Sequence, residues 1–183
     1  PIYYLGRDSK GNLLAGGVNS RIGLISISPE GRVTDRFPLS DGQSRTFGNV
    51  RCVLEIEPGR FLIGTRNDGL YDYRMTEGTY THYKTGHDPD ERGNIPDNYV
   101  SSIFRDSNSN IWVGTFGGGF SLFVPSTGRF ETYSTYNGRP ENNVCAIVED
   151  SFGHLWVSTI SGISEFNPVD RSFVHYTHAN GIQ

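Results

Sequence analysis

Residues 106–119 read Asp-Ser-Asn-Ser-Asn-Ile-Trp-Val-Gly-Thr-Phe-Gly-Gly-Gly, and the architecture can be worked out from this stretch. Polar turn residues come first, then a short apolar segment that ends in Gly-Thr, then a glycine turn. Residues 150–162 repeat the plan as Asp-Ser-Phe-Gly-His-Leu-Trp-Val-Ser-Thr-Ile-Ser-Gly. Short apolar runs bounded by Gly, Asn, Asp and Ser are typical of β-strands joined by tight turns.

The same plan occurs four times along the 183 residues. The fourth residue of the second apolar segment marks the repeat. In the four copies this residue is Gly16, Gly64, Gly114 and Ser158. These positions are 48, 50 and 44 residues apart. An aliphatic residue stands fourteen positions before each of them, at Ile2, Val50, Val100 and Val144. A period of this length is typical of solenoids, propellers and arrays.

Each repeat is predicted to be a meander of four antiparallel strands. In the third copy we expect strands over 100–105, 111–115, 120–124 and 129–133. One such sheet cannot bury both faces, and radial stacking of copies solves that problem, so the sequence predicts an all-β chain of four β-propeller blades. We expect the blades at 1–49, 50–99, 100–143 and 144–183, the last with a connector toward a further blade.

Composition narrows the possible functions. The net charge is -4 without a basic cluster, which disfavours nucleic-acid binding. No apolar run is long enough to span a membrane, and no signal peptide begins the chain, which suggests a trimmed fragment. Cys52 and Cys145 lie in repeats that are not adjacent, and we expect both to be small buried residues without a mutual disulfide.

The segments 106–119 and 150–162 resemble the two-component regulator propeller repeat. In that family such repeats form the periplasmic sensor region of membrane histidine kinases, many of them hybrid regulators of gut Bacteroidetes that respond to oligosaccharides. The family sensor usually has two seven-bladed propellers and an immunoglobulin-like domain. The resemblance therefore implies four blades of a larger, about seven-bladed propeller. It also implies a homodimeric inner-membrane parent whose kinase domains lie outside this chain.

Ligand-reading residues are expected on the face formed by the connectors 38–49, 84–99 and 134–143 and by the turns between second and third strands. The repeat signature itself is structural, so we select residues that differ between copies. They are Arg66, Asn67, Asp68, Asn98, Tyr99, Phe116, Arg139, Asn142 and Asn143. Amide, guanidinium and aromatic groups suit the hydroxyl and acidic groups of an oligosaccharide. The alternative is that Asn98 and Asn143 only cap strand starts, as Asn49 would.

Other motifs have structural interpretations that we favour. The segment 87–91 (His-Asp-Pro-Asp-Glu) could bind a cation, but its irregular spacing indicates a solvated loop. Residues 106–110 lack the glycine and glutamate of a calcium loop, and residues 117–119 lack the helix of a phosphate loop. Trp112 and Trp156 occupy a repeated position and are expected in the core. We therefore expect no catalytic residue, metal or cofactor.

Two rival functions stay open. A propeller lyase resembling streptogramin lyase would need a histidine base beside a metal on the central face. The histidines here, such as His82 and His175, fall on outer strands, turns or connectors instead. A lectin-like propeller would bind sugars without signalling.

Overall fold

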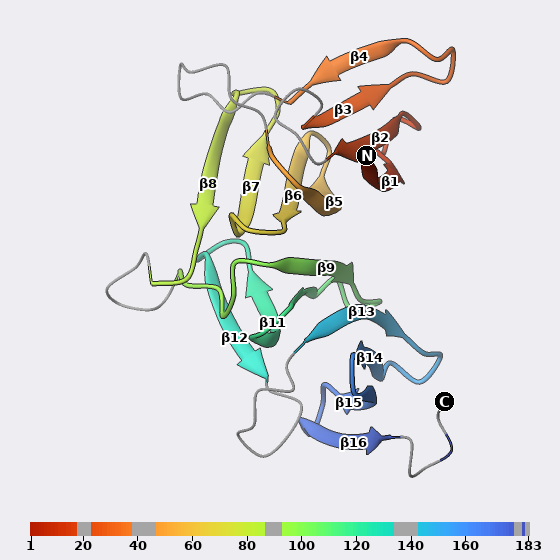
Figure 1. Cartoon of the computed structure of the whole chain (residues 1–183), viewed down its shortest axis with the longest axis vertical. Coiled ribbons are helices and arrows are strands. Elements are labelled where there is room, and N and C mark those ends of the chain that lie inside the picture. The colour runs from red at the N-terminus through yellow and green to blue at the C-terminus, as the bar shows by residue number, and fades with distance from the viewer. Residues whose placement is uncertain (18–22, 38–46, 87–92, 134–142, 178–180, 182–183) are drawn as a thin grey trace. The chain divides into compact units, whose positions relative to one another are not determined.

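A computed structural model describes residues 1–17, 23–37, 47–86, 93–133, 143–177 and 181. None of these described residues is helical, and they form four four-stranded antiparallel sheets (Figure 1). The sheets are four β-propeller blades, which confirms the predicted fold class. No helix in the described ranges is long and apolar enough to cross a membrane.

Each blade is built from strands that are consecutive in the sequence. Blade 1 contains β1 (Ile2–Arg7), β2 (Leu13–Gly17), β3 (Leu24–Ile27) and β4 (Val33–Arg36). Blade 2 contains β5 (Val50–Glu57), β6 (Arg60–Thr65), β7 (Leu70–Arg74) and β8 (Thr79–Tyr83). Blade 3 contains β9 (Val100–Arg105), β10 (Ile111–Thr115), β11 (Gly119–Val124) and β12 (Arg129–Tyr133). Blade 4 contains β13 (Val144–Glu149), β14 (Leu155–Thr159), β15 (Gly162–Asn167) and β16 (Ser172–Tyr176).

The strands expected in the third copy are confirmed to within one residue, because their turns are encoded locally by Asp, Asn and Gly. The chain divides into two compact units, Pro1–Tyr83 with blades 1 and 2 and Lys84–Gln183 with blades 3 and 4. We call the two faces of each blade leading and trailing. Within a unit, the trailing face of the first blade packs against the leading face of the second.

Within the first unit, the trailing face of blade 1 packs against the leading face of blade 2. Blade 1 contributes Leu14, Leu24 and Phe37 to this core. Blade 2 contributes Val50, Val53, Phe61, Ile63, Tyr71 and Tyr73. Phe37 meets Phe61 edge-to-face at 5.3 Å between ring centroids, so aromatic contacts lock the two blades together.

Within the second unit, the same pattern joins blades 3 and 4. The core cluster unites Trp112 and Phe120 from blade 3 with Val144, Ile147, Leu155, Val157 and Phe166 from blade 4. Successive side chains of a strand point to opposite faces, which is why Trp112 faces blade 4 while its neighbours Ile111 and Val113 face away. Trp112 and Phe166 meet edge-to-face at 5.7 Å between centroids.

The repeated glycine has a packing reason. A Cβ on Gly114 would lie 2.6 Å from Cγ1 of Val144, and a Cβ on Gly16 would lie 2.7 Å from Cγ1 of Val50. The first strand of the following blade therefore presses its valine directly onto the glycine backbone. Blade 4 carries Ser158 at this position. Glycine is needed where a following valine occupies the space that a side chain would fill.

Each unit exposes apolar residues on one of its blade faces. The leading face of blade 1 presents Leu5 and Leu13, and the trailing face of blade 4 presents Val148 and Val174. Each face has the apolar character of the faces that are buried between blades, so each has the chemistry of a stacking surface.

The expectation for the two cysteines is half right. Cys52 is buried on β5, and burial raises the pKa of its thiol well above the ordinary range. Cys145 is exposed on β13, which corrects the prediction of a buried residue. The β-bulge between Val144 and Ala146 interrupts the register at this point, so strand alternation did not give the environment of Cys145.

Candidate functional site

The most regular polar feature is an aspartate that holds both a turn and a tryptophan. Oδ1 of Asp106 accepts hydrogen bonds from the backbone N–H groups of Asn108 and Asn110, at 3.0 and 2.8 Å. Oδ2 accepts one from the indole Nε1 of Trp112 at 2.8 Å. Both oxygens are thereby used inside the turn. The segment is an Asx-type turn, as predicted, and not a calcium loop.

Blade 4 repeats this arrangement with Asp150 and Trp156, whose Nε1 lies 2.8 Å from Oδ2 of the aspartate. This hydrogen bond and those from the turn N–H groups lower the pKa of Asp150. Trp112 is fully buried, as expected for a core residue. Trp156 is only half-buried and stacks on Tyr176 at 5.6 Å, because it lies on the trailing face of blade 4.

Three of the residues selected from the sequence meet in the second unit. The N–H of Phe116 donates to the carbonyl of Tyr99 at 2.9 Å, and Phe116 forms an isolated β-bridge with Asn143. The rings of Tyr99 and Phe116 are 5.2 Å apart with a tilt of 33°. Phe116 is exposed, so the Tyr99–Phe116 pair presents an aromatic surface beside an amide side chain.

Asn98 bonds within its own connector. Its Oδ1 accepts from the N–H of Thr85 at 3.0 Å, and its Nδ2 donates to Oγ1 of Thr85 at 2.9 Å. Asn98 therefore ties the connector to itself. The positions directly before each first strand are Asn49, Tyr99 and Asn143, so Asn98 is not the equivalent of Asn49. Arg139, Asn142 and the segment 87–91 lie outside the described residues.

The first unit carries the remaining selected residues in the β6–β7 turn. The N–H of Arg66 donates to the carbonyl of Asn49 at 3.0 Å, which parallels the Phe116 bond in blade 3. Arg66 and Asn67 are exposed, while Asp68 is half-buried. Oγ1 of Thr65 accepts from the N–H of Asp68 at 2.9 Å and donates to the carbonyl of Gly69. The Thr65 hydroxyl thus bonds two backbone groups of the turn and fixes its conformation.

His82 completes a cluster that sequence reasoning missed. Its Nε2 lies 2.6 Å from the carbonyl oxygen of Asp68, and its ring stacks on Tyr71 at 4.0 Å and 9°. The hydroxyl of Tyr71 donates to Oδ2 of Asp68. His82 and Tyr71 are cross-strand partners in the β7–β8 pair, so the signal was available in the register. The His82 ring therefore helps to hold the β6–β7 turn in place.

A second cluster brings Asp150, His154 and Glu165 together, with candidate metal-ligand atoms within 4.8 Å of one another. Nδ1 of His154 lies 2.7 Å from Oε1 of Glu165, and the hydroxyl of Tyr176 donates to Oε2 at 3.1 Å. Both oxygens of Asp150 already accept hydrogen bonds from its own turn and from Trp156. Hydrogen bonding within blade 4 accounts for the whole arrangement.

The described histidines do not gather at one site. His82 lies on β8, His175 on β16 and His154 in the β13–β14 turn. Nδ1 of His175 lies 2.9 Å from Oγ of Ser164. Among the described residues no histidine stands on a first strand, which is where a general base on a central face would be placed.

These blades define a protein of the β-propeller class. Residues 94–117 and 138–161 match the sequence model of the two component regulator propeller family, so the chain carries repeats of that family in blades 3 and 4. None of the curated proteins matches the chain in sequence.

Solved structures agree with this assignment. The extracellular domain of the proposed hybrid two component system BT3049 from B. thetaiotaomicron is 23% identical with a TM-score of 0.76; the match covers 99% of this chain and 23% of that one. The extracellular domain of the proposed one component system BT4673 from the same organism is 25% identical with a TM-score of 0.71, covering 100% and 26%. A streptogramin B lyase is 15% identical with a TM-score of 0.67, covering 96% and 54%, and shares the fold alone. The chain thus spans about a quarter of the length of the two B. thetaiotaomicron domains.

Proposed function

We propose that this chain is part of the extracytoplasmic sensor domain of a two-component histidine kinase of the hybrid type, which senses oligosaccharides released from glycans. The observation that carries the proposal is the match of two blades to the two component regulator propeller family. The similarity over the full chain to extracellular domains of B. thetaiotaomicron two component and one component systems supports it.

The ligand surface in this proposal is made of the turns and strand starts described above. In the second unit, exposed Phe116 and half-buried Tyr99 offer aromatic area for the apolar face of a sugar, and Asn143 offers amide hydrogen bonds. In the first unit, Arg66, Asn67 and Asp68 offer charged and amide groups for hydroxyl and acidic substituents. Arg139 and Asn142 are proposed to contribute from the connector before blade 4.

The proposed mechanism uses the blades as rigid bodies. Aromatic cores join blades 1 and 2 and, separately, blades 3 and 4, so a ligand is not expected to deform a blade. Binding would instead favour one arrangement of whole propellers in a dimeric parent, and kinase domains outside this chain would respond. In this proposal the parent lies in the inner membrane with the propeller in the periplasm.

The direct test is calorimetric binding of a panel of neutral, uronate-containing and sulfated oligosaccharides. Phe116→Ala should weaken binding of any ligand found by roughly tenfold, because loss of one stacking contact is worth about 1–1.5 kcal/mol. Ile160→Ala is the matched control, since Ile160 is the exposed residue at the equivalent position of blade 4. Equal losses in both variants, or no loss in either, would remove the Tyr99–Phe116 pair from the ligand surface.

The sensor role has a separate test in the gene. Reading the sequence outward from both ends should reveal a signal peptide, further blades, an apolar span of roughly 20 residues and a kinase. A stop codon soon after the last blade, with no membrane span, would contradict a receptor. The lyase and lectin alternatives would then take precedence, and loss of activity on chelation would separate them.

A further inference from the structure

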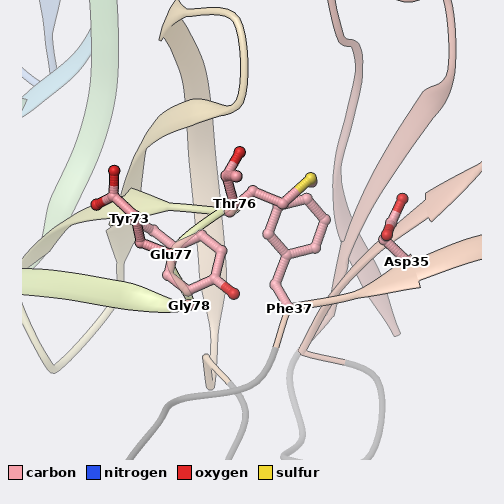
Figure 2. Close-up of a pocket in the computed structure, with 7 residues that line it drawn as sticks. Asp35, Phe37, Tyr73, Thr76, Glu77 and Gly78 are labelled. Atoms are coloured by element: carbon pink, nitrogen blue, oxygen red, sulfur yellow. The ribbon is translucent and has the colours of Figure 1, made fainter.

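A pocket of about 420 Å³ opens between blades 1 and 2, inside the Pro1–Tyr83 unit. The end of β4 forms one wall and the β7–β8 turn forms the other. It is lined by Asp35, Phe37, Tyr73, Met75, Thr76, Glu77 and Gly78 (Figure 2). The volume lies within the range of roughly 300–1,000 Å³ that small-molecule sites occupy. None of these residues belongs to the proposed oligosaccharide surface, so the pocket is a separate candidate site.

Tyr73 supplies a hydroxyl group to this pocket. Its side chain is only 3% exposed, yet its hydroxyl makes no hydrogen bond with any residue in the described part of the chain. Figure 2 shows the hydroxyl oxygen at the end of the ring nearest Phe37, among the lining side chains. The hydroxyl is not among the fully buried unpaired polar atoms of the described residues, so it opens to the solvent of the pocket and can exchange water for a ligand group. The Tyr73 hydroxyl is therefore positioned to bond a ligand.

The pocket is also negatively charged. Asp35 and Glu77 contribute carboxylates, and none of the lining residues whose side chains the structure describes is Lys, Arg or His. Nε of Arg74 lies 3.9 Å from Oε2 of Glu77 and partly balances that charge. Burial raises the pKa of the Tyr73 hydroxyl, and the negative charge of Asp35 raises it further. The phenol thus stays protonated beside a carboxylate.

We propose that this pocket binds the ammonium group of an organic amine. Asp35 would accept a charge-assisted hydrogen bond from the ammonium, the Tyr73 oxygen would accept a second, and methylene groups would lie against Phe37 and Met75. A neutral sugar fits less well, because Phe37 is 1% exposed and offers no open ring face for stacking. The shared chemistry is an alkylammonium, carried by a small amine, an amino sugar or a lysine side chain of a partner.

Met75 gives an unusually direct readout, since it is the single methionine of the chain. Labelling its methyl group with ¹³C yields one resonance, inside the pocket, for the intact 183-residue chain. Titrations would use n-butylammonium against 1-butanol, glucosamine against N-acetylglucosamine, and Nα-acetyl-lysine methylamide. We expect a saturable shift of the Met75 resonance with at least one ammonium probe, and at least tenfold weaker binding of its uncharged counterpart. The tightest ammonium probe identifies the source.

Variants test the assigned residues. Asp35→Asn should weaken ammonium binding roughly tenfold, since a charge-assisted hydrogen bond is about twice as strong as a neutral one. Tyr73→Phe should weaken it by a smaller factor while keeping the fold, which the amide spectrum would report. Glu30→Gln removes an exposed blade 1 carboxylate outside the pocket and should change nothing. Equal shifts with charged and uncharged probes, no saturable shift with any ammonium, or unchanged binding by Asp35→Asn would overturn the proposal.

Discussion

Blades 2 and 4 place a cation and a carboxylate at the same positions of nearly the same backbone, yet the two pairs differ in kind. In blade 2, Arg60 bonds Asp72 through two parallel contacts of 2.9 and 2.7 Å, and the Asp72 side chain is 2% exposed. In blade 4, Nδ1 of His154 lies 2.7 Å from Glu165, and their side chains are 31% and 21% exposed. The Arg60–Asp72 pair is a buried bidentate ion pair, which we call the buried fork, and the His154–Glu165 pair is partly exposed to solvent.

The difference shows what the blade positions require. Blade 3 has Asn110 and Leu122 at these places, so the fold needs no ion pair there. A carboxylate is tolerated in blade 2 because the planar guanidinium satisfies both of its oxygens. Those hydrogen bonds to Asp72 in turn raise the pKa of Arg60. Blade 4 tolerates Glu165 because His154 and Tyr176 each bond one of its oxygens.

The largest effect is expected from breaking the buried fork. Arg60→Ala leaves Asp72 buried without its partner and should lower the free energy of unfolding by about 3–5 kcal/mol. His154→Ala is the matched variant in blade 4 and should cost less than about 1 kcal/mol, because its pair is partly solvated. Urea unfolding of each variant measures both values.

A double variant sharpens this result. Arg60→Asn with Asp72→Leu installs the blade 3 pair in blade 2 and should recover most of the lost stability, because no buried charge is left alone. Comparable losses in the single and double variants would show that the backbone of blade 2, and not the uncompensated carboxylate, sets the cost.

A smaller loss should follow from filling the glycine position of blade 3. Gly114→Ala places a methyl group against Val144 and should lower the free energy of unfolding by about 1–3 kcal/mol through overpacking. Ser158→Ala at the equivalent position of blade 4 should change it little. If Gly114→Ala were neutral by thermal unfolding, blade 4 would have to shift away from blade 3 more easily than their packed core suggests.

Removing the turn aspartate of blade 3 should destabilise the protein about as much as Gly114→Ala, or somewhat less. Asp106→Ala deletes the acceptor of two backbone N–H groups and of the buried Trp112 indole, which should lower the free energy of unfolding by about 1–3 kcal/mol. Near-ultraviolet circular dichroism should report altered packing of Trp112. Asp106→Asn is the control, because its amide oxygen keeps one acceptor and should preserve part of the stability.

The smallest expected effect is an increase in the free energy of unfolding. Ser109 has a φ of 66° at the turn position where Gly11 and Gly153 have 82°. A left-handed backbone costs a residue with a side chain about 1–2 kcal/mol, and glycine loses some of that advantage through its freer unfolded state. Ser109→Gly should therefore raise the free energy of unfolding by about 0.5–1 kcal/mol. The reverse change, Gly153→Ser, should lower the free energy of unfolding similarly; changes of the same sign in the two variants would contradict the turn equivalence.

Strand positions could be predicted because their signals are local. The turn aspartates, the glycine steps and the alternation around Trp112 each act within a few residues, so the structure reproduces them. The environments of Cys145 and Trp156 could not be predicted, since they depend on the bulge in β13 and on what stacks against blade 4. The bonds of Asn98 could not be predicted either, because its partner Thr85 is thirteen residues away in a connector.

The candidate sites also divide into those with local sequence signals and those that depend on distant residues. Phe116, Tyr99 and Asn143 share conserved repeat spacing, and their contact is a consequence of the blade register. The Asp68–Tyr71–His82 cluster depends on the cross-strand pairing of Tyr71 with His82 in the β7–β8 ladder. The Asp35–Tyr73 pocket joins two blades through side chains about forty residues apart, and no local pattern marks it.

Among the strands that the structure describes, every sheet pairs strands that follow one another directly, and this has a consequence during synthesis. A blade can pair its strands as soon as its own residues leave the ribosome, because no later segment is needed to complete the sheet. The stacking partner, however, arrives one repeat later. At about 5–20 residues per second, a repeat of roughly 50 residues leaves an apolar face uncovered for about 3–10 seconds. The cell must shield that face for this interval, so chaperone demand should rise with each added blade.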